Sequence, residues 1–256
     1  KSFLNEKNEF VIPTIYENKI NNLPLSNISN VSSVYCNESG EYLIIDTDRY
    51  GFNNPDYVWE SNTPSIVILG DSFAQGACVK YGHGASDKIR KEYSKTINLG
   101  MGGTGPLLQL AILKEYTEAH KPKAVLWFFY EGNDMSINMG IEEKSPDVLK
   151  YLEPDFNNKL MEKSELTDRF LREYSDRNFE KLKKSEVEIV KKEFSWKHRL
   201  KLISVREKLN LTSCHARNLN FGLLKEALVE GNRHVESIGG KLYFIYCVIL
   251  NRMKPY

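Results

Sequence analysis

Residues 66–79, IVILGDSFAQGACV, place a hydroxyl group where it could act as a nucleophile. An apolar, mostly β-branched run ends at Gly70, and Asp71 and Ser72 follow directly before a predicted helix. A serine at a tight turn between a buried strand and a helix is pushed out of the sheet, and a helix N-terminus favours negative charge beside it. Ser72 is therefore a candidate nucleophile.

Two further loops carry hydrogen-bond donors that suit the same chemistry. NLGMGGTGP, residues 98–106, offers backbone N–H groups that no side chain shields, and EGND, residues 131–134, offers the side-chain amide of Asn133. Both loops follow short apolar runs, TINL at 96–99 and AVLWFFY at 124–130, which predict strands. In a parallel sheet the loops at the carboxyl ends of the strands gather on one edge. A hydroxyl with several convergent donors describes a nucleophile with an oxyanion hole.

The elements that must position these loops alternate between strand and helix. Helices are predicted over residues 85–94 and over 106–120, where Pro106 suits the first turn. A third helix, 221–240, ends at a glycine pair and precedes a fourth apolar run at 241–250. This alternation predicts βαβ units and an α/β fold with a parallel sheet.

The chain divides into three parts around this core. Residues 1–60 show little periodicity apart from a predicted strand at 41–46, and we expect an irregular N-terminal extension packed on the core. Residues 61–256 are expected to form the α/β domain itself. Within it, residues 141–215 are rich in charged side chains with apolar residues at helical spacing, which predicts an inserted charged helical cap. The cap is either a solvated surface or a protein-binding surface.

Composition narrows the classes of partner. The net charge is +1, from 35 basic and 34 acidic side chains, which favours neither nucleic acid nor anionic lipid. No apolar run approaches the roughly 20 residues of a membrane span. The four cysteines show no metal-binding spacing, and we expect no metal. Cys36 and Cys78 lie near predicted loops, so a disulfide between them stays open; it would imply an oxidising compartment.

Together the three loops resemble the SGNH or GDSL hydrolase family. The resemblance rests on GDS after an apolar strand, the block from Asn98 to Gly105, and Asn133-Asp134, in this order and spacing. It covers about residues 64–134 and extends weakly to 250. It implies a flavodoxin-like, three-layer fold around a five-stranded parallel sheet, and ester substrates such as acylated sugars, lipids or thioesters, with no cofactor.

The resemblance also assigns roles to particular residues. It implies that Ser72 is the nucleophile and that the oxyanion hole consists of the Ser72 N–H, the Gly103 N–H and the Asn133 amide. Two departures stand out: Glu131 occupies a position that is glycine in the family, and no histidine has an aspartate three residues before it. We therefore expect the Asp-x-x-His block, with the general base, beyond residue 256. The chain is then a fragment open at both ends, and nearly inactive alone.

The favoured function is ester hydrolysis through an acyl-serine, with a small-molecule or glycan ester as substrate, or acyl transfer to a sugar hydroxyl. One alternative is a catalytically inactive glycan-binding or scaffold module of the same fold. Another is a dinucleotide-binding module, because GMGGTG satisfies G-x-G-x-x-G, although Glu131 lies 26 residues past Gly105 and not about 20. A lipase-like elbow would need glycine where Ala74 stands. A cell-envelope or periplasmic location is favoured over the cytoplasm, and nothing indicates the oligomeric state.

Overall fold

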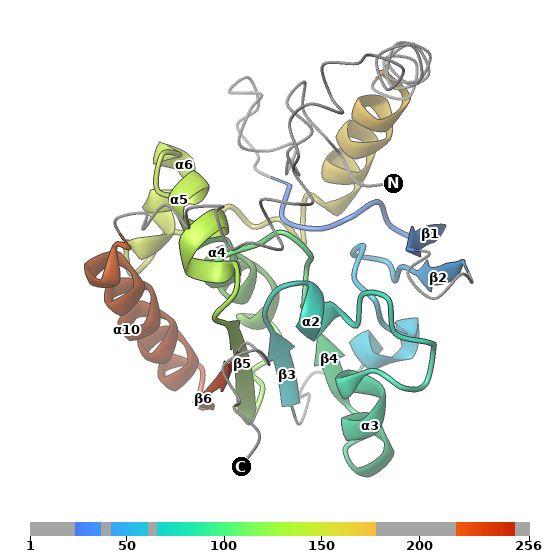
Figure 1. Cartoon of the computed structure of the whole chain (residues 1–256), viewed down its shortest axis with the longest axis horizontal. Coiled ribbons are helices and arrows are strands. Elements are labelled where there is room, and N and C mark those ends of the chain that lie inside the picture. The colour runs from blue at the N-terminus through green and yellow to red at the C-terminus, as the bar shows by residue number, and fades with distance from the viewer. Residues whose placement is uncertain (1–23, 37–41, 61–65, 178–218, 249–256) are drawn as a thin grey trace, which may run out of the picture. The chain divides into compact units, whose positions relative to one another are not determined.

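The computed structural model describes residues 24–36, 42–60, 66–177 and 219–248. The chain forms two compact units, one of residues Lys1–Asp168 with Leu219–Tyr256 and one of residues Arg169–Asn218. The first unit contains the sheet and the candidate site (Figure 1). In the second unit the described residues, 169–177, are helical. Most of the predicted cap, from residue 178 to 215, lies outside the described residues.

The sheet of the first unit has four parallel strands among the described residues. They are β3 (Ile66–Leu69), β4 (Thr96–Asn98), β5 (Ala124–Tyr130) and β6 (Lys241–Cys247), in the spatial order β4-β3-β5-β6. Val67 aligns with Ile97 on one side and with Val125 on the other, and all three are almost completely buried. The predicted parallel α/β sheet is therefore confirmed.

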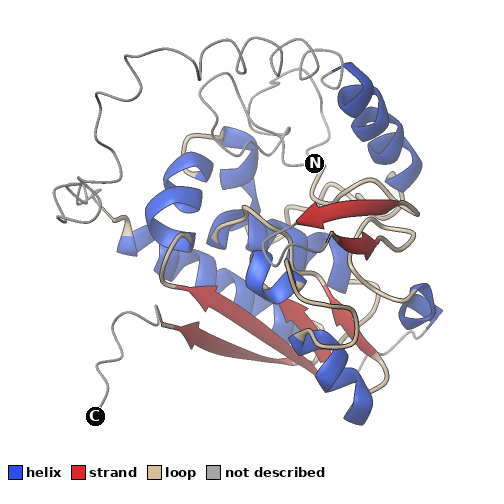
Figure 2. Ribbon diagram, turned by 45° about the vertical axis from the view of Figure 1, so that its right-hand side comes forward, coloured by secondary structure: helices blue, strands red, loops and turns tan. Residues whose placement is uncertain are grey.

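Helices cover this sheet in a way compatible with a three-layer fold. On one face α4 (Pro106–Thr117) and α10 (Phe221–Ser237) pack against Trp127, which donates a 2.6 Å hydrogen bond to Gln109 of α4. A short helix, α3 (Ala85–Glu92), contacts the opposite face, where Ser86 accepts a hydrogen bond from the Asn98 side chain. Figure 1 shows α10 at the β6 end of the sheet and α3 at the β4 end, and Figure 2 shows helices along the strands.

The N-terminal segment is more regular than the sequence indicated. Strands β1 (Ser32–Cys36) and β2 (Leu43–Asp46) form a two-stranded antiparallel sheet, and a 3-10 helix, η1, spans Asp56–Glu60. The segment packs on the main domain through buried aromatic residues, since Phe52 makes an edge-on ring contact with Tyr116 of α4 at 4.8 Å. The strand predicted at 41–46 is thus present as β2.

The start of the predicted insertion belongs to the core. A π-helical turn, η2 (Asp134–Asn138), leads into α5 (Met139–Glu142), α6 (Pro146–Leu149) and η3 (Lys150–Leu152), and residues 164–177 are helical. Glu115 of α4 accepts hydrogen bonds from the Tyr151 hydroxyl and from the backbone N–H of Leu160. Tyr151 and Leu160 are fully buried, so this stretch contributes side chains to the core although several of its other residues are exposed.

Candidate functional site

Ser72 begins a very short helix at the end of β3. This helix, α2 (Ser72–Gln75), is capped by Asp71, whose Oδ1 accepts a 2.9 Å hydrogen bond from the Phe73 N–H, and it ends at Gly76 with φ +80°. Gly70, at φ +150°, makes the turn out of the strand, where a Cβ would come 2.7 Å from the Phe128 carbonyl oxygen. Asp71 is buried whereas Ser72 is partly exposed, so the turn presents Ser72 to solvent.

The glycine-rich loop after β4 lies against Ser72. The Met101 N–H donates a 3.0 Å hydrogen bond to the Gly70 carbonyl, which continues the pairing of β3 and β4 past the strand ends. A Cβ at Gly100 would overlap the backbone nitrogen of Gln75, and one at Gly102 would lie 3.5 Å from the Ser72 Cβ. Glycine at both positions is what allows this close approach.

Asn98 fixes the start of the same loop. Its Oδ1 accepts a 2.8 Å hydrogen bond from the Gly100 N–H, and its Nδ2 donates a 2.9 Å bond to the Ala74 carbonyl of α2. The Gly102 N–H donates to Gln75 Oε1 at 2.9 Å. No acceptor among the described residues takes the N–H of the next residue, Gly103, which is partly exposed with φ +79°. Its oxyanion-hole role stays a prediction.

Asn133 enters the site from the loop after β5. Its side chain and that of Ser72 lie close enough to Asp71 to lower the pKa of that carboxyl, although burial has the largest effect and raises it. Asn133 Oδ1 and Asp71 Oδ2 are buried without a hydrogen-bond partner in the described part of the chain. Ser72 and Asn133 therefore meet beside Asp71, and the loop that carries Gly103 contacts Ser72 through Gly102.

A second buried acid, Asp134, belongs to the third block of the resemblance but was given no role from the sequence. Its Oδ2 accepts a 2.9 Å hydrogen bond from the Tyr130 N–H, and its Oδ1 has no partner among the described residues. Burial, together with the charge of Asp71, raises the pKa of Asp134 to about 8. Asp134 is therefore mostly neutral at pH 7, and burial raises the pKa of its neighbour Asp71 as well.

Glu142 of α5 occupies the N-terminus of α4. Its carboxylate accepts hydrogen bonds from the N–H groups of Gly105, Leu107 (3.1 Å) and Leu108 (3.3 Å), and burial raises its pKa to about 7. In a dinucleotide-binding module these N–H groups would face the pyrophosphate. Because an acidic side chain of the chain itself fills that place, the glycine fingerprint gives little support to dinucleotide binding.

Neither His120 nor His234 is placed to act as a general base for Ser72. His234 lies 3.0 Å from Thr117 Oγ1, and burial, with the nearby Lys114 charge, lowers its pKa to about 4. His120 packs against Trp59 just after α4. Both lie at the C-terminal end of this 12-residue helix, about 18 Å along the axis from its start beside the glycine loop. His83 is exposed in the loop before α3, and His198 and His215 lie outside the described residues.

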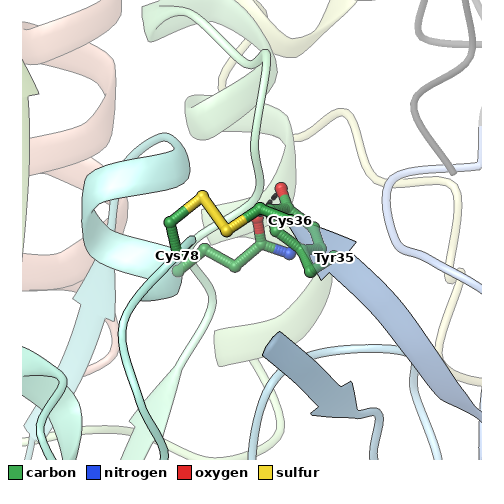
Figure 3. The surroundings of a disulfide bond; sticks show 4 residues. Tyr35, Cys36 and Cys78 are labelled. Atoms are coloured by element: carbon green, nitrogen blue, oxygen red, sulfur yellow. Dashed lines mark hydrogen bonds between the residues drawn. A yellow bond between two sulfur atoms is a disulfide. The ribbon is translucent and has the colours of Figure 1, made fainter. Parts of the chain in front are cut away.

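The N-terminal segment contributes residues that the sequence did not point to. The Tyr35 hydroxyl of β1 donates a 2.6 Å hydrogen bond to Gln75 Oε1, and the neighbouring Cys36 forms a disulfide with Cys78 (Figure 3). The disulfide decides the question that the sequence left open. Tyr35 lies in no recognisable motif. Its one sequence signal is that it precedes Cys36, whose possible disulfide with Cys78 would bring Tyr35 close to the segment that contains Ser72.

Among the described residues, no group of three or more His, Cys, Asp and Glu side chains is arranged to hold a metal ion. In the same part of the chain, no helix combines the length and apolar character needed to cross a membrane. Compared with known proteins, the chain matches no protein-family model, no curated sequence and no solved structure.

Proposed function

We propose that this protein is a serine ester hydrolase of the SGNH type, or an acyltransferase that uses the same acyl-serine chemistry. One observation carries the proposal: three loops from the carboxyl ends of β3, β4 and β5 meet around the partly exposed Ser72. A glycine loop pressed against a serine, beside a side-chain amide, has the composition of an oxyanion hole. A serine that only capped a helix would need neither neighbour.

The proposed reaction begins when Ser72 Oγ attacks the carbonyl carbon of an ester and its proton passes to a base. The carbonyl oxygen, now negative, accepts hydrogen bonds from the Ser72 N–H, the Gly103 N–H and the Asn133 amide. The intermediate collapses to an acyl-serine as the alcohol leaves with a proton. Water then releases the acid, or a sugar hydroxyl takes the acyl group in a transferase. The base is proposed to be a histidine outside the described residues.

The substrate class is proposed on two grounds. The resemblance favours acylated carbohydrates and other small esters, and the Cys36–Cys78 disulfide favours a compartment in which disulfides persist. An envelope or periplasmic location satisfies both. Acylated glycans and short-chain acetyl esters are therefore the first substrates to screen.

The experiment that tests this function combines turnover with active-site labelling in the full-length protein. Hydrolysis of p-nitrophenyl acetate and labelling by a fluorophosphonate probe are compared for the wild type, Ser72→Ala, and Ser94→Ala, an exposed control serine. We expect Ser72→Ala to lose labelling and at least about 10³-fold in turnover, because no other nucleophile replaces it. Ser94→Ala should behave as the wild type. Labelling that persists in Ser72→Ala would overturn the assignment.

The second candidate is a catalytically inactive glycan-binding or scaffold module. The observation that favours it is the placement of His120 and His234 at the far end of α4 from the glycine loop. This second function predicts that the folded full-length protein neither hydrolyses esters nor reacts with the fluorophosphonate probe. It also predicts that the protein binds acylated glycans without deacylating them. The same experiment therefore separates the two functions.

A further inference from the structure

Gln75 connects the two loops that form the proposed oxyanion hole. It is the last residue of α2, three residues after Ser72, and its side chain is 2% exposed. Its Oε1 accepts two hydrogen bonds, one from the Gly102 N–H at 2.9 Å and one from the Tyr35 hydroxyl at 2.6 Å. One short helix thus carries Ser72 at its start and the anchor of the glycine loop at its end.

The bond to Gly102 bears directly on the neighbouring donor. With the Gly102 N–H held by Gln75, the peptide plane that precedes Gly102 is fixed relative to α2. The next N–H, that of Gly103, is the one proposed to bind the oxyanion. A backbone shift at Gly102 would displace it, and misplacement by about 1 Å can cost on the order of 10²-fold in rate.

Tyr35 holds Gln75 in the orientation that this bond requires. Its hydroxyl lies against Gly102 so closely that a Cβ there would overlap it. Burial, with the charge of Asp71, raises the pKa of Tyr35 to about 12, so the hydroxyl keeps its proton and remains a donor to Gln75 near neutral pH. Since the amide oxygen of Gln75 faces both donors, rotation of the amide is blocked.

The disulfide fixes Tyr35 in turn. Cys36 follows Tyr35 in β1, and Cys78 lies three residues after Gln75, with the two Cα atoms 5.6 Å apart. Strand β1 is thereby joined to the segment around α2 by one covalent bond and one side-chain hydrogen bond, as Figure 3 shows. If the disulfide is reduced, the hydrogen bond between Tyr35 and Gln75 is the remaining one of these two links between β1 and the α2 segment.

From these contacts we propose that Gln75 is a positioning residue for the oxyanion hole, and that Tyr35 and the Cys36–Cys78 disulfide set its orientation. The inference rests on the proposed hydrolase function. It adds a condition to that function: turnover depends on the oxidised state of a disulfide that contains no reacting atom.

The test is a double-mutant cycle in the full-length protein, with p-nitrophenyl acetate as substrate. Gln75→Leu removes the acceptor at similar volume, Tyr35→Phe removes only the hydroxyl, and the exposed Tyr57→Phe is the matched control. We expect Gln75→Leu to lower kcat about 10- to 100-fold with KM changed less than about threefold, because the ester still binds. Tyr35→Phe should lower kcat less, and the double variant should match Gln75→Leu, since Tyr35 acts through Gln75.

Two further measurements separate positioning from general loss of structure. Amide hydrogen exchange of residues 100–105 should quicken in Gln75→Leu and in the reduced wild type. Reduction should lower kcat of the wild type but not of Gln75→Leu. Two results would overturn this inference while Ser72 labelling still supports the hydrolase. One is that the effects of Tyr35→Phe and Gln75→Leu on kcat are fully additive in the double variant. The other is that both single variants fold and keep the wild-type kcat. A wild type without labelling or turnover would instead remove the hydrolase function, and this inference with it.

Discussion

At the scale of single residues, the site is built around acids that are buried without full hydrogen bonding. Asp71 Oδ2 and Asp134 Oδ1 both lack a partner among the described residues, and burial together with the charge of Asp71 makes Asp134 costly to ionise. Because its pKa is raised to about 8, Asp134 stays protonated at neutral pH, and a second buried charge is avoided. Burial raises the pKa of Asp71 too, while hydrogen bonds from the Asn133 and Ser72 side chains lower it.

This arrangement predicts a pH dependence that Asp134→Asn removes. Because the folded-state pKa of about 8 exceeds the ordinary value of 3.8, the unfolded chain loses this proton first as pH rises. Wild-type stability therefore falls between about pH 4 and pH 8 relative to the variant, by up to about 1.4 kcal/mol per pH unit. Urea unfolding across this range measures the difference, with the exposed Glu92→Gln as control. Parallel stability curves for wild type and Asp134→Asn would contradict it.

The sequence identified the candidate reacting residues of this site, but not the residues that hold them in position. Ser72, the glycine loop and Asn133 carry motif and composition signals, because a nucleophile and its donors need particular residue types at strand ends. Gln75 and Tyr35 carry no such signal, since any buried acceptor and donor could form the same bridge. Glu142 could not be predicted for another reason. It accepts hydrogen bonds from the N-terminus of α4, which lies 34 to 37 positions earlier in the chain, and local sequence patterns do not encode contacts over that separation.

At the scale of elements, α4 is the centre of the fold. All of its residues are buried, including Lys114, whose Nζ donates to the carbonyls of Tyr151, Glu153 and Pro154 and pairs with Glu230 of α10 at 3.1 Å. One ammonium group therefore joins α4 to α10 and to the segment after η3. The strands and helices around it were predictable from apolar runs, Pro106 and the glycine pair at 239–240, but this cross-link was not.

Lys114→Met should consequently destabilise the protein strongly. The apolar replacement fits a similar volume but removes the ammonium that the Tyr151 and Glu153 carbonyl oxygens accept from. It also leaves the buried Glu230 carboxylate with Arg233 as its remaining donor among the described residues. Breaking one partner of a buried charged network typically costs about 3–5 kcal/mol. Equilibrium unfolding in guanidinium chloride measures the loss, and the exposed Lys123→Met is the matched control. Equal unfolding free energies for Lys114→Met and Lys123→Met would show that the network is dispensable.

At the scale of the whole molecule, the N-terminal segment is part of both the core and the site. The sequence predicted an irregular extension here, because residues 1–60 lack the periodic signals of the α/β core. The structure has two short strands and a 3-10 helix there, Phe52 and Trp59 are buried, and β1 carries Tyr35 to Gln75. Contacts of this kind join residues 40 or more positions apart, so they follow from the assembled fold and not from local sequence.

The Cys36–Cys78 disulfide should therefore stabilise the whole protein as well as the site. It closes a loop with a sequence separation of 42, for which the chain-entropy model gives about 4 kcal/mol of stabilisation through the unfolded state. Unfolding of the wild type and of a Cys36→Ala, Cys78→Ala double variant measures this contribution, with Cys247→Ala, a free and partly exposed cysteine, as control. Added reductant should lower the wild type to the level of the double variant and leave that variant unchanged. A double variant as stable as the oxidised wild type would mean that β1 is held in place by its non-covalent contacts alone.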